Sequence, residues 1–584
     1  MRLTLALGFF SAAAGQQAGD AKKEVHLPMP IQHCTKALGC KFEDATVVLD
    51  SNWRWTHEIG CTNSSKCNCF LGNQWVNATC QGVDDCSHVR LAHFGPRPLV
   101  GFLELQRCTF PPPYPTPKRR CRADYAPRLI RHSRPLPSLP RAQKCGIDGE
   151  DAKGYKEKYG ATADGQGGVN FTFITKYNTT GGNGTNVGTR LFLLESPDKY
   201  KMFQLLNKEF TFTVDGSALP CGLNGAVYFV EMDADGGKSK YPTNTAGAAY
   251  GTGYCDAQCP HDIKWIAGQA NLINWNPSPS DPNGGAGKFG TCCAELDIWE
   301  ANSISTQMTV HACETAGYHP CDDIECGDNP NHRFDGVCDK NGCDANPYRQ
   351  GLHDFFGPGP SFTLDATKPM QVVTQFITDD GTDTGNLVEM RRFYVQDSKY
   401  IYPPNPSYTP PGKNYTAISD EMCQVQMTNF SDRFDVFTKK GGIAGMGAAM
   451  KRGMALVLSL WDDHDVGMIW LDANDPDPKD WPTPGVPPPG ALRGTCNQTS
   501  GNYTFVEKYH SDAYVIYSDV RYGEIGSTTG PGAPPPPPAC PGGTKDKCIA
   551  LCDPTDPAKY VACVQNCDQN CPHLDEARRK YMPI

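Results

Sequence analysis

Apolar and polar residues alternate over many short runs of this 584-residue chain. From residue 169 onward the runs recur between turns rich in Gly, Asn, Asp and Pro, for example at 171–175, 210–214, 227–230, 372–377 and 454–461. A period of two is typical of β-strands with one buried face, and sustained helical periodicity is scarce. The regular spacing of the runs predicts an all-β antiparallel sandwich rather than alternating α/β layers.

The first residues and the cysteines indicate export from the cell. Residues 1–15 combine Arg2, an apolar stretch and a final group of small residues, which is typical of a cleaved secretory signal peptide. The 28 cysteines fit an oxidising compartment in which disulfides form. Glycosylation sequons, which agree with a secreted glycoprotein, occur at Asn63, Asn77, Asn170, Asn178, Asn183, Asn414, Asn429, Asn497 and Asn502.

Charge and hydropathy exclude two classes of partner. A net charge of -10 does not suit a nucleic-acid-binding protein. After the signal peptide no stretch reaches the roughly 18 apolar residues that a membrane span needs. We therefore expect a soluble, extracellular monomer that binds neither nucleic acid nor membrane.

Residues 89–143 differ from the rest of the chain in composition. They hold ten Arg and one Lys against only Glu104 and Asp124, include a run of three prolines and show no hydrophobic period. Such a segment is not expected to pack into a core. It could be a basic interaction loop or a disordered insertion, but we favour a retained intron, because a Val codon begins GT and a Gln codon can end AG.

The end of the chain divides into a linker and a small module. Residues 527–539 contain five consecutive prolines and predict a stiff, extended linker after a main domain of residues 16–526. In residues 540–584 the cysteines 548, 552, 563, 567 and 571 repeat at helical spacing. This pattern predicts a disulfide-stapled helical hairpin whose function the sequence does not indicate.

Three carboxylates, Glu295, Asp297 and Glu300, lie within six residues and are the strongest candidates for chemistry. In a regular strand Glu295 and Asp297 share a face, whereas Glu300 points to the other side. A β-bulge would bring all three to one side. Two carboxyls about 5 to 5.5 Å apart across a glycosidic bond are what a retaining glycosidase needs. An acidic strand edge or a metal site are the alternatives.

Two further patterns bear on the surroundings of these carboxylates. Residues 47–55 predict a strand with Trp53 and Trp55 on one face, either as core packing or as a platform for sugar rings. Four cysteines at 255, 259, 292 and 293 could form a zinc site. In an exported chain two disulfides are the favoured reading, and they would brace the strand that carries Glu295. We expect no metal and no cofactor.

Long stretches of the chain resemble the family-seven glycoside hydrolases, which include fungal-type cellobiohydrolases and endoglucanases. The matching segments are 52–57, 219–225, 232–237, 240–247, 251–255, 292–305 and 459–463. The resemblance extends from about residue 34 to 529, apart from 89–143. It implies a curved β-jelly-roll sandwich with a substrate groove on its concave face, and it identifies residues 16–526 as a glycoside hydrolase domain.

The resemblance also implies roles for single residues. Glu295 matches the nucleophile, Glu300 the acid/base, Asp297 the group that hydrogen-bonds the nucleophile, and His311 the active-site histidine near the acid/base. Glu300 must then hold a proton while Glu295 is ionised. The positions that match the substrate groove are Trp53, Trp55, Trp461 and Trp470 for stacking, Tyr228, Tyr254, Gln258 and Lys264 for polar contacts, and Arg333 and Arg493 on the product side.

Loop lengths favour a cellobiohydrolase that releases cellobiose processively from cellulose or a related β-1,4-glucan. Segments 274–290 and 313–343 resemble the tunnel-forming loops of cellobiohydrolases. However, His464 and Asp465 stand where the family has tyrosines, residues 326–338 lack a tyrosine, and Asn341 replaces a common Asp. We therefore expect a partly open tunnel. An endoglucanase of the same family is the alternative within the class, and a non-catalytic jelly-roll lectin is the alternative outside it.

The cysteine pairing is implied by the resemblance too. It pairs Cys255 with Cys293, Cys259 with Cys292, Cys221 with Cys496, and Cys343 with Cys423. Cys61 and Cys67 form a pair for which the family has no counterpart.

Overall fold

Two ten-stranded sheets form the body of the protein in the computed structural model, which describes residues 16–60, 68–75, 145–179, 182–328 and 331–529. We call them the β24 sheet and the β31 sheet. The main path of the β24 sheet is β2 (Leu27–Pro28), β5 (Thr46–Leu49), β14 (Thr189–Ser196), β34 (Met454–Asp462), β18 (Leu223–Val230), β24 (Glu295–Ala301), β25 (Thr306–His311) and β27 (Cys343–Ala345). That of the β31 sheet is β10 (Ala161–Ala163), β11 (Val169–Thr172), β35 (Tyr514–Glu524), β17 (Lys208–Asp215), β30 (Met370–Thr378), β31 (Leu387–Gln396) and β32 (Lys399–Ile401).

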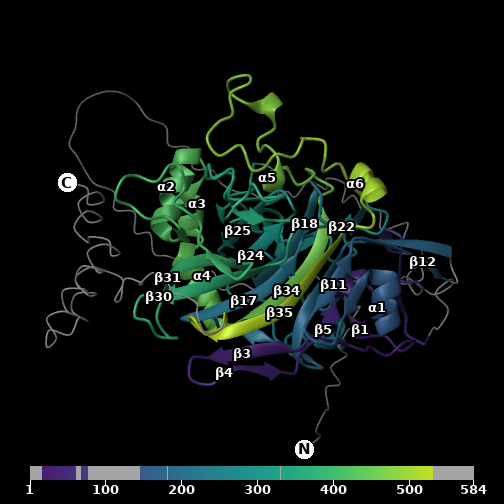
Figure 1. Cartoon of the computed structure of the whole chain (residues 1–584). Helices are drawn as coiled ribbons and strands as arrows, with labels where there is room; N and C mark the ends of the chain where they lie inside the picture. Colours follow the sequence, from purple (N-terminus) through teal and green to yellow (C-terminus); the bar gives the residue numbers. More distant parts are fainter. Residues whose placement is uncertain (1–15, 61–67, 76–144, 180–181, 329–330, 530–584) are drawn as a thin grey trace, which may run out of the picture.

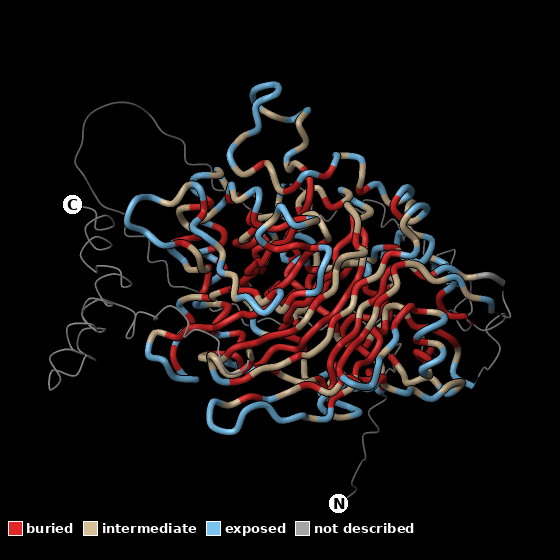
Figure 2. The backbone as a smooth tube through the Cα atoms, in the orientation of Figure 1, coloured by how far each residue is buried: buried red, intermediate tan, exposed pale blue. Residues whose placement is uncertain are grey.

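The main hydrophobic core lies between the two sheets. Phe210 of β17 meets Phe229 of β18 with ring centroids 5.1 Å apart, and Phe212 of β17 lies 6.4 Å from Trp299 of β24. Figure 2 shows the buried residues running along the central strands. Every second side chain of a strand faces this layer, so alternation in the sequence becomes burial in the fold. The prediction of an antiparallel β-jelly-roll sandwich is confirmed.

Three of the described helices cover one end of the sandwich. Helices α2 (Asp420–Phe430), α3 (Phe434–Lys439) and α4 (Gly442–Arg452) lie together at one end (Figure 1), and α4 packs against β31 and β25. Ser419 caps α2 by accepting a hydrogen bond from the Met422 amide at 3.2 Å. Helices α1 (Ala152–Tyr159), α5 (Ile469–Asp472) and α6 (Tyr503–Tyr509) are shorter than α2 and α4 and lie apart from this group. None of the described helices is both long and apolar enough to span a membrane.

The predicted strand over residues 47–55 is wrong in its second half. Strand β5 ends at Leu49, and a 3-10 helix, η1 (Ser51–Trp53), follows. Asp50 causes the break, because its carboxylate accepts a hydrogen bond from the Asn52 amide at 2.8 Å and caps the helix. Trp53 and Trp55 therefore do not share a strand face.

All four disulfides implied by the resemblance are present: Cys221–Cys496, Cys255–Cys293, Cys259–Cys292 and Cys343–Cys423. The zinc alternative for the second and third pairs is therefore wrong. Four further described disulfides are Cys34–Cys40, Cys69–Cys145, Cys313–Cys338 and Cys321–Cys326. The predicted signal peptide, residues 89–143, the pair Cys61 and Cys67, most of the linker and the module at 540–584 lie outside the described residues.

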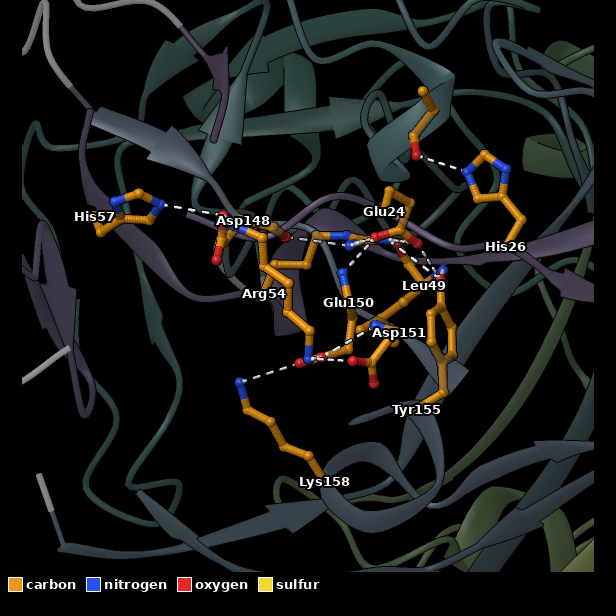
Figure 3. Close-up of polar contacts among 12 residues, drawn as sticks. Glu24, His26, Leu49, Arg54, His57, Asp148, Glu150, Asp151, Tyr155 and Lys158 are labelled. Carbon is orange, nitrogen blue, oxygen red and sulfur yellow. Dashed lines mark hydrogen bonds and ion pairs between the residues drawn. The ribbon is translucent and has the colours of Figure 1, made fainter. Parts of the chain in front are cut away.

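A buried polar network joins the N-terminal segment to the chain on both sides of residues 76–144 (Figure 3). Strand β9 (Cys145–Ile147) pairs with β1 (Gln17–Ala18) and with β6 (Thr56–Glu58). Arg54 forms a bidentate ion pair with Glu24, in which Nη2 lies 2.9 Å from Oε1. The Tyr155 hydroxyl also donates a hydrogen bond to Glu24. Burial alone would raise the pKa of Glu24, but the Arg54 charge and these hydrogen bonds bring it below its ordinary value.

Removing one partner of this ion pair should strongly reduce the stability of the fold. Arg54→Met should lower the free energy of unfolding by about 3–5 kcal/mol, because it leaves the Glu24 carboxylate buried without a partner. A carboxyl whose folded pKa is lowered stabilises the fold above its ordinary pKa, and this contribution disappears as the pH falls through the folded value. The difference between Arg54→Met and wild type, measured by urea unfolding, should therefore narrow on acidification.

Lys153→Met is the matched control, since Lys153 and Glu157 form an ion pair on the exposed face of α1. It should change stability little at any pH. An Arg54→Met protein as stable as wild type at neutral pH would show that the ion pair between Arg54 and Glu24 does not stabilise the fold.

Candidate active site

A bulge in β24 decides where its side chains point. On the β18 side, Val227 faces Trp299 and Tyr228 faces Asp297, so Ile298 has no partner. On the β25 side the register shifts between Asp297 and Glu300. Both Ile298 and Trp299 turn into the core, as Leu296 and Ala301 do. Alternation across the bulge leaves Glu295, Asp297 and Glu300 on the other face of the strand, here called the β24 face, where the charge of Asp297 acts on Glu295 and that of Glu300 acts on Asp297. The predicted bulge is confirmed.

Glu300 is held from both neighbouring strands. Asn224 on β18 donates to its Oε1 at 3.0 Å, and Gln307 on β25 donates to its Oε2 at 2.9 Å. Both donors lie on strands that pair directly with β24, so the carboxyl is fixed by the sheet itself. The sequence analysis missed both. Asn224 falls within a segment that matches the family and Gln307 lies just after one, but neither side chain carried a signal of its own.

Glu295 is held by a loop that the predicted disulfides brace. Its Oε2 accepts a hydrogen bond at 3.0 Å from the amide of Ala257. That amide lies between Cys255 and Cys259, which are bonded to Cys293 and Cys292 just ahead of β24. The two crosslinks tie this loop to the segment just ahead of β24.

His311 on β25 contacts the middle carboxyl. Its Nε2 lies 3.2 Å from Asp297 Oδ2, and its Nδ1 lies 2.8 Å from the Asp339 carbonyl. Because a carbonyl only accepts, Nδ1 carries a hydrogen and Nε2 is presented to Asp297. Gly342 permits this arrangement: its φ is +67°, and a Cβ there would lie 2.7 Å from His311 Nδ1.

Burial dominates the electrostatics of the three carboxyls, which are 8%, 5% and 8% exposed. Burial raises the pKa of Glu295, and the charges of Asp297 and Asp256 raise it further. Burial and the Glu300 charge raise the pKa of Asp297, which is hydrogen-bonded to Glu295. Burial also raises the pKa of Glu300, although hydrogen bonds from Gln307 and Asn224 oppose the change. The group therefore keeps protons at a pH where exposed carboxyls are ionised.

Ligand atoms of Glu295, Asp297 and His311 lie within 4.8 Å of one another, a spacing that a cation could bridge. Their existing contacts account for the arrangement in another way, because Asp297 bonds to both neighbours and Glu295 accepts from a backbone amide. The donor set therefore does not call for a metal.

A chain of buried hydroxyls runs from β18 towards Glu295. The hydroxyls of Tyr228 and Tyr254 lie 2.9 Å apart, and Tyr254 donates to Asp256 Oδ2 at 2.7 Å. The guanidinium of Arg190 lies 3.3 Å from the centroid of the Tyr254 ring. Since the Asp256 charge acts on Glu295, the predicted groove residues Tyr228 and Tyr254 do adjoin the carboxyl cluster. Asp256 and Arg190 were not predicted.

The two other predicted polar residues are anchored to backbone carbonyls. Lys264 Nζ donates to the Asn52 carbonyl at 2.6 Å and lies over the Phe70 ring, and burial lowers its pKa to about 8. Gln258 donates from its side chain to the Lys340 carbonyl at 2.8 Å. The backbone amide of Gln258 donates a hydrogen bond to Asp256, which connects Gln258 to the cluster around Glu295.

The four predicted stacking residues fall into separate environments. Trp461 at the end of β34 and Trp470 on α5 stack with centroids 6.1 Å apart and planes inclined by 28°. The Arg190 guanidinium lies 5.1 Å from the Trp53 ring. Trp55 stacks on His57 at 4.1 Å, so one of its faces is covered. Among the four, only Trp461 and Trp470 are brought into ring contact with each other.

Of the two predicted arginines, Arg493 is the one tied to the Glu300 side of the site. It donates to Asp344 at 3.2 Å, and the Asp344 charge acts on Glu300. Arg333 donates to Asn341 at 2.9 Å and to the Lys340 carbonyl. Asn341 thus accepts a neutral hydrogen bond from Arg333, whereas an Asp at this position would form an ion pair with it.

His464, which replaces a family tyrosine, forms an ion-pair cluster. Its Nε2 lies 3.5 Å from Asp462 and 3.1 Å from Glu507 on α6, and its ring stacks on Tyr503. Burial opposes protonation, but the two carboxylates raise the pKa of His464 to about 10. The cluster links the end of β34 to α6.

Comparison with known proteins places the same segments in one family. A family model described as glycosyl hydrolase family 7 matches residues 18–91 and 140–529. A cellobiohydrolase of that family from Daphnia pulex is 43% identical, with a TM-score of 0.72 over 88% of this chain and 100% of that one. A cellobiohydrolase from Melanocarpus albomyces, complexed with cellotetraose, is 37% identical, with a TM-score of 0.70 over 88% and 99%. A Humicola insolens endocellulase is 30% identical, with a TM-score of 0.61 over 88% and 100%.

Proposed function

Because the chain belongs to glycosyl hydrolase family 7, we propose that it is a secreted, retaining β-1,4-glucanase that hydrolyses cellulose by double displacement. The observation that carries the proposal is the bulge in β24, which turns Glu295, Asp297 and Glu300 to one face. The two solved cellobiohydrolases, one of them bound to cellotetraose, support the substrate class.

In the first step Glu295 attacks the anomeric carbon while Glu300 gives its proton to the departing glycosidic oxygen. In the second step Glu300 takes a proton from water, which displaces Glu295 from the glycosyl-enzyme and restores both carboxyls. Burial keeps Glu300 protonated above the ordinary pKa of a glutamate. The hydrogen bonds from Asn224 and Gln307 hold it in place as its charge alternates.

Asp297 controls the charge of Glu295. The two carboxyls are hydrogen-bonded and mutually repulsive, so a single proton shared between them leaves one ionised. With that proton on Asp297, Glu295 is the carboxylate and can attack. His311, whose ring is oriented by the Asp339 carbonyl, contacts Asp297 and fixes the side chain that holds the proton.

The remaining predicted residues would bind the glucan on either side of these carboxyls. Pyranose faces are apolar and stack on aromatic rings, which is the role we assign to Trp53, Trp55, Trp461 and Trp470. Tyr228, Tyr254, Gln258 and Lys264 would bond sugar hydroxyls near Glu295. Arg333 and Arg493, held by Asn341 and Asp344, would bond hydroxyls of the leaving sugar.

Glu295→Gln tests the catalytic assignment. The amide has the shape of the carboxyl but is a poor nucleophile, so turnover of cellulose should fall more than about 1,000-fold. Binding of cellotetraose, measured by calorimetry, should persist. Glu421→Gln is the control, because Glu421 is an exposed carboxylate on α2 that pairs with Lys413.

Unchanged turnover in Glu295→Gln would overturn the assignment of the nucleophile. Wild-type protein that binds cellotetraose but does not cleave it would instead favour the lectin alternative.

Within the family we propose a cellobiohydrolase that releases cellobiose processively through a partly open tunnel. Identity is higher to the two cellobiohydrolases than to the endocellulase. Segment 313–343 is long, and the disulfides Cys313–Cys338 and Cys321–Cys326 lie within it. His464 and Asp465 replace aromatic residues that would help to close the roof, and His464 is held by Asp462 and Glu507 instead. An endoglucanase remains the alternative.

Product analysis separates the two. A cellobiohydrolase should release mainly cellobiose from crystalline cellulose and reduce the viscosity of carboxymethylcellulose little. A rapid fall in viscosity with mixed products would favour the endoglucanase.

A further inference from the structure

Arg392 on β31 reaches from the β31 sheet across the core to the bulge in β24. It shares the core face of its strand with Met390 and Tyr394, and only 8% of it is exposed. Its Nη2 donates a hydrogen bond to the carbonyl of Ile298 and lies 3.2 Å from Met308 Sδ. Ile298 is the extra residue of the bulge on the β18 side, and Met308 stands opposite the bulge on β25. One guanidinium therefore contacts both sides of the irregularity.

This arginine differs from the other deeply buried arginines. Arg54 pairs with Glu24, Arg190 with Asp50, and both Arg349 and Arg493 with Asp344. Within the part of the chain that the structure describes, Arg392 forms no ion pair and its Nε has no hydrogen-bond partner, although its guanidinium also interacts with Tyr394, whose ring centroid lies 5.8 Å away. Burial lowers the pKa of Arg392. A buried charge without a counter-charge costs several kcal/mol, so a core built only for stability would favour an apolar residue here.

The bulge explains why a donor is needed at this point. A regular ladder satisfies the carbonyls of a central strand from its two neighbours, but a bulge leaves the extra residue without a partner. The carbonyl of Ile298 would then lie buried and unsatisfied, at a cost of about 1–3 kcal/mol. A hydrogen bond from a cationic donor is about twice as strong as a neutral one. The Ile298 carbonyl lies between Asp297 and Glu300 in the chain. A hydrogen bond that holds this carbonyl in one orientation therefore also sets the relative orientation of the two side chains.

We infer that Arg392 is a positioning residue, which holds the bulge in the conformation that aligns Glu300 with Asp297 and Glu295. This inference rests on the proposed function of those carboxyls. Arg392 touches neither substrate nor reacting atoms, and it acts through the backbone of Ile298.

Arg392→Met tests the inference. Methionine fills most of the same core volume, and apolar replacement of a buried charge is often neutral for stability. The bulge loses its donor, so kcat on cellotetraose should fall about 10- to 100-fold, as expected for a misplacement near 1 Å. KM should stay within about threefold, because the sugar-binding side chains are untouched. The limb of the pH profile that reports Glu300 should also shift. Arg392→Lys, which keeps a cationic donor, should recover part of kcat.

Arg391→Met is the matched control. Arg391 is the adjacent residue, points to the opposite face of β31 and pairs with Glu389. It should leave kcat and the pH profile as in wild type. Thermal unfolding of all three variants shows whether they are folded at the assay temperature.

Two results would overturn the inference. One is an Arg392→Met enzyme with wild-type kcat, KM and pH profile. The other is a loss of kcat that matches a loss of folded protein, with an unshifted pH profile and no recovery in Arg392→Lys, because that pattern belongs to a purely structural residue. Failure of the proposed function would look different from failure of this inference. The wild-type protein would not cleave the glucan, or Glu295→Gln would leave turnover unchanged.

Discussion

One extra residue in β24 determines how the rest of the site is built. Without the bulge, Glu300 would face the core between the two sheets and Glu295 the opposite side. With it, Ile298 and Trp299 fill the core next to Phe212 and Tyr394, and three carboxyls gather on the β24 face. The strand is central in its sheet, so β18 and β25 supply the side chains that orient Glu300 from either side. Packing and chemistry are thus set by the same irregularity.

The residues around β24 hold its three buried carboxyls in place. Disulfides Cys255–Cys293 and Cys259–Cys292 tie down the loop whose Ala257 amide bonds Glu295. His311 contacts Asp297, and Gly342 lets the neighbouring loop come close to the imidazole. Burial disfavours ionisation of every carboxyl, which supplies an acid, while the hydrogen bond between Asp297 and Glu295 allows one of that pair to be ionised. In the proposed mechanism the acid and the nucleophile differ in their hydrogen-bond partners, which are Asn224 and Gln307 for Glu300 and the Ala257 amide for Glu295.

Much of this arrangement could be predicted from the sequence, because the signals were local or matched a family. The alternating runs predict the sandwich, the spacing of Glu295, Asp297 and Glu300 requires a bulge, and the resemblance implied four disulfides that are present. The prediction of a strand at 47–55 was wrong in its second half, because a capping hydrogen bond to Asp50 outweighed strand propensity. Asn224, Gln307 and Arg392 were missed for a different reason. Each acts through a partner on another strand or in the other sheet, and no periodicity within a strand indicates such a contact.

If Glu295 and Glu300 act from one face of β24 as nucleophile and acid/base, the reaction retains the anomeric configuration, so the stereochemistry of the product is the decisive measurement. Carboxyls about 5 to 5.5 Å apart give retention, whereas a wider separation leaves room for water and gives inversion. Proton NMR of cellotetraose hydrolysis, recorded before mutarotation, distinguishes the two. With retention, the β-anomer of the newly formed reducing end should appear first. Initial formation of the α-anomer would contradict it.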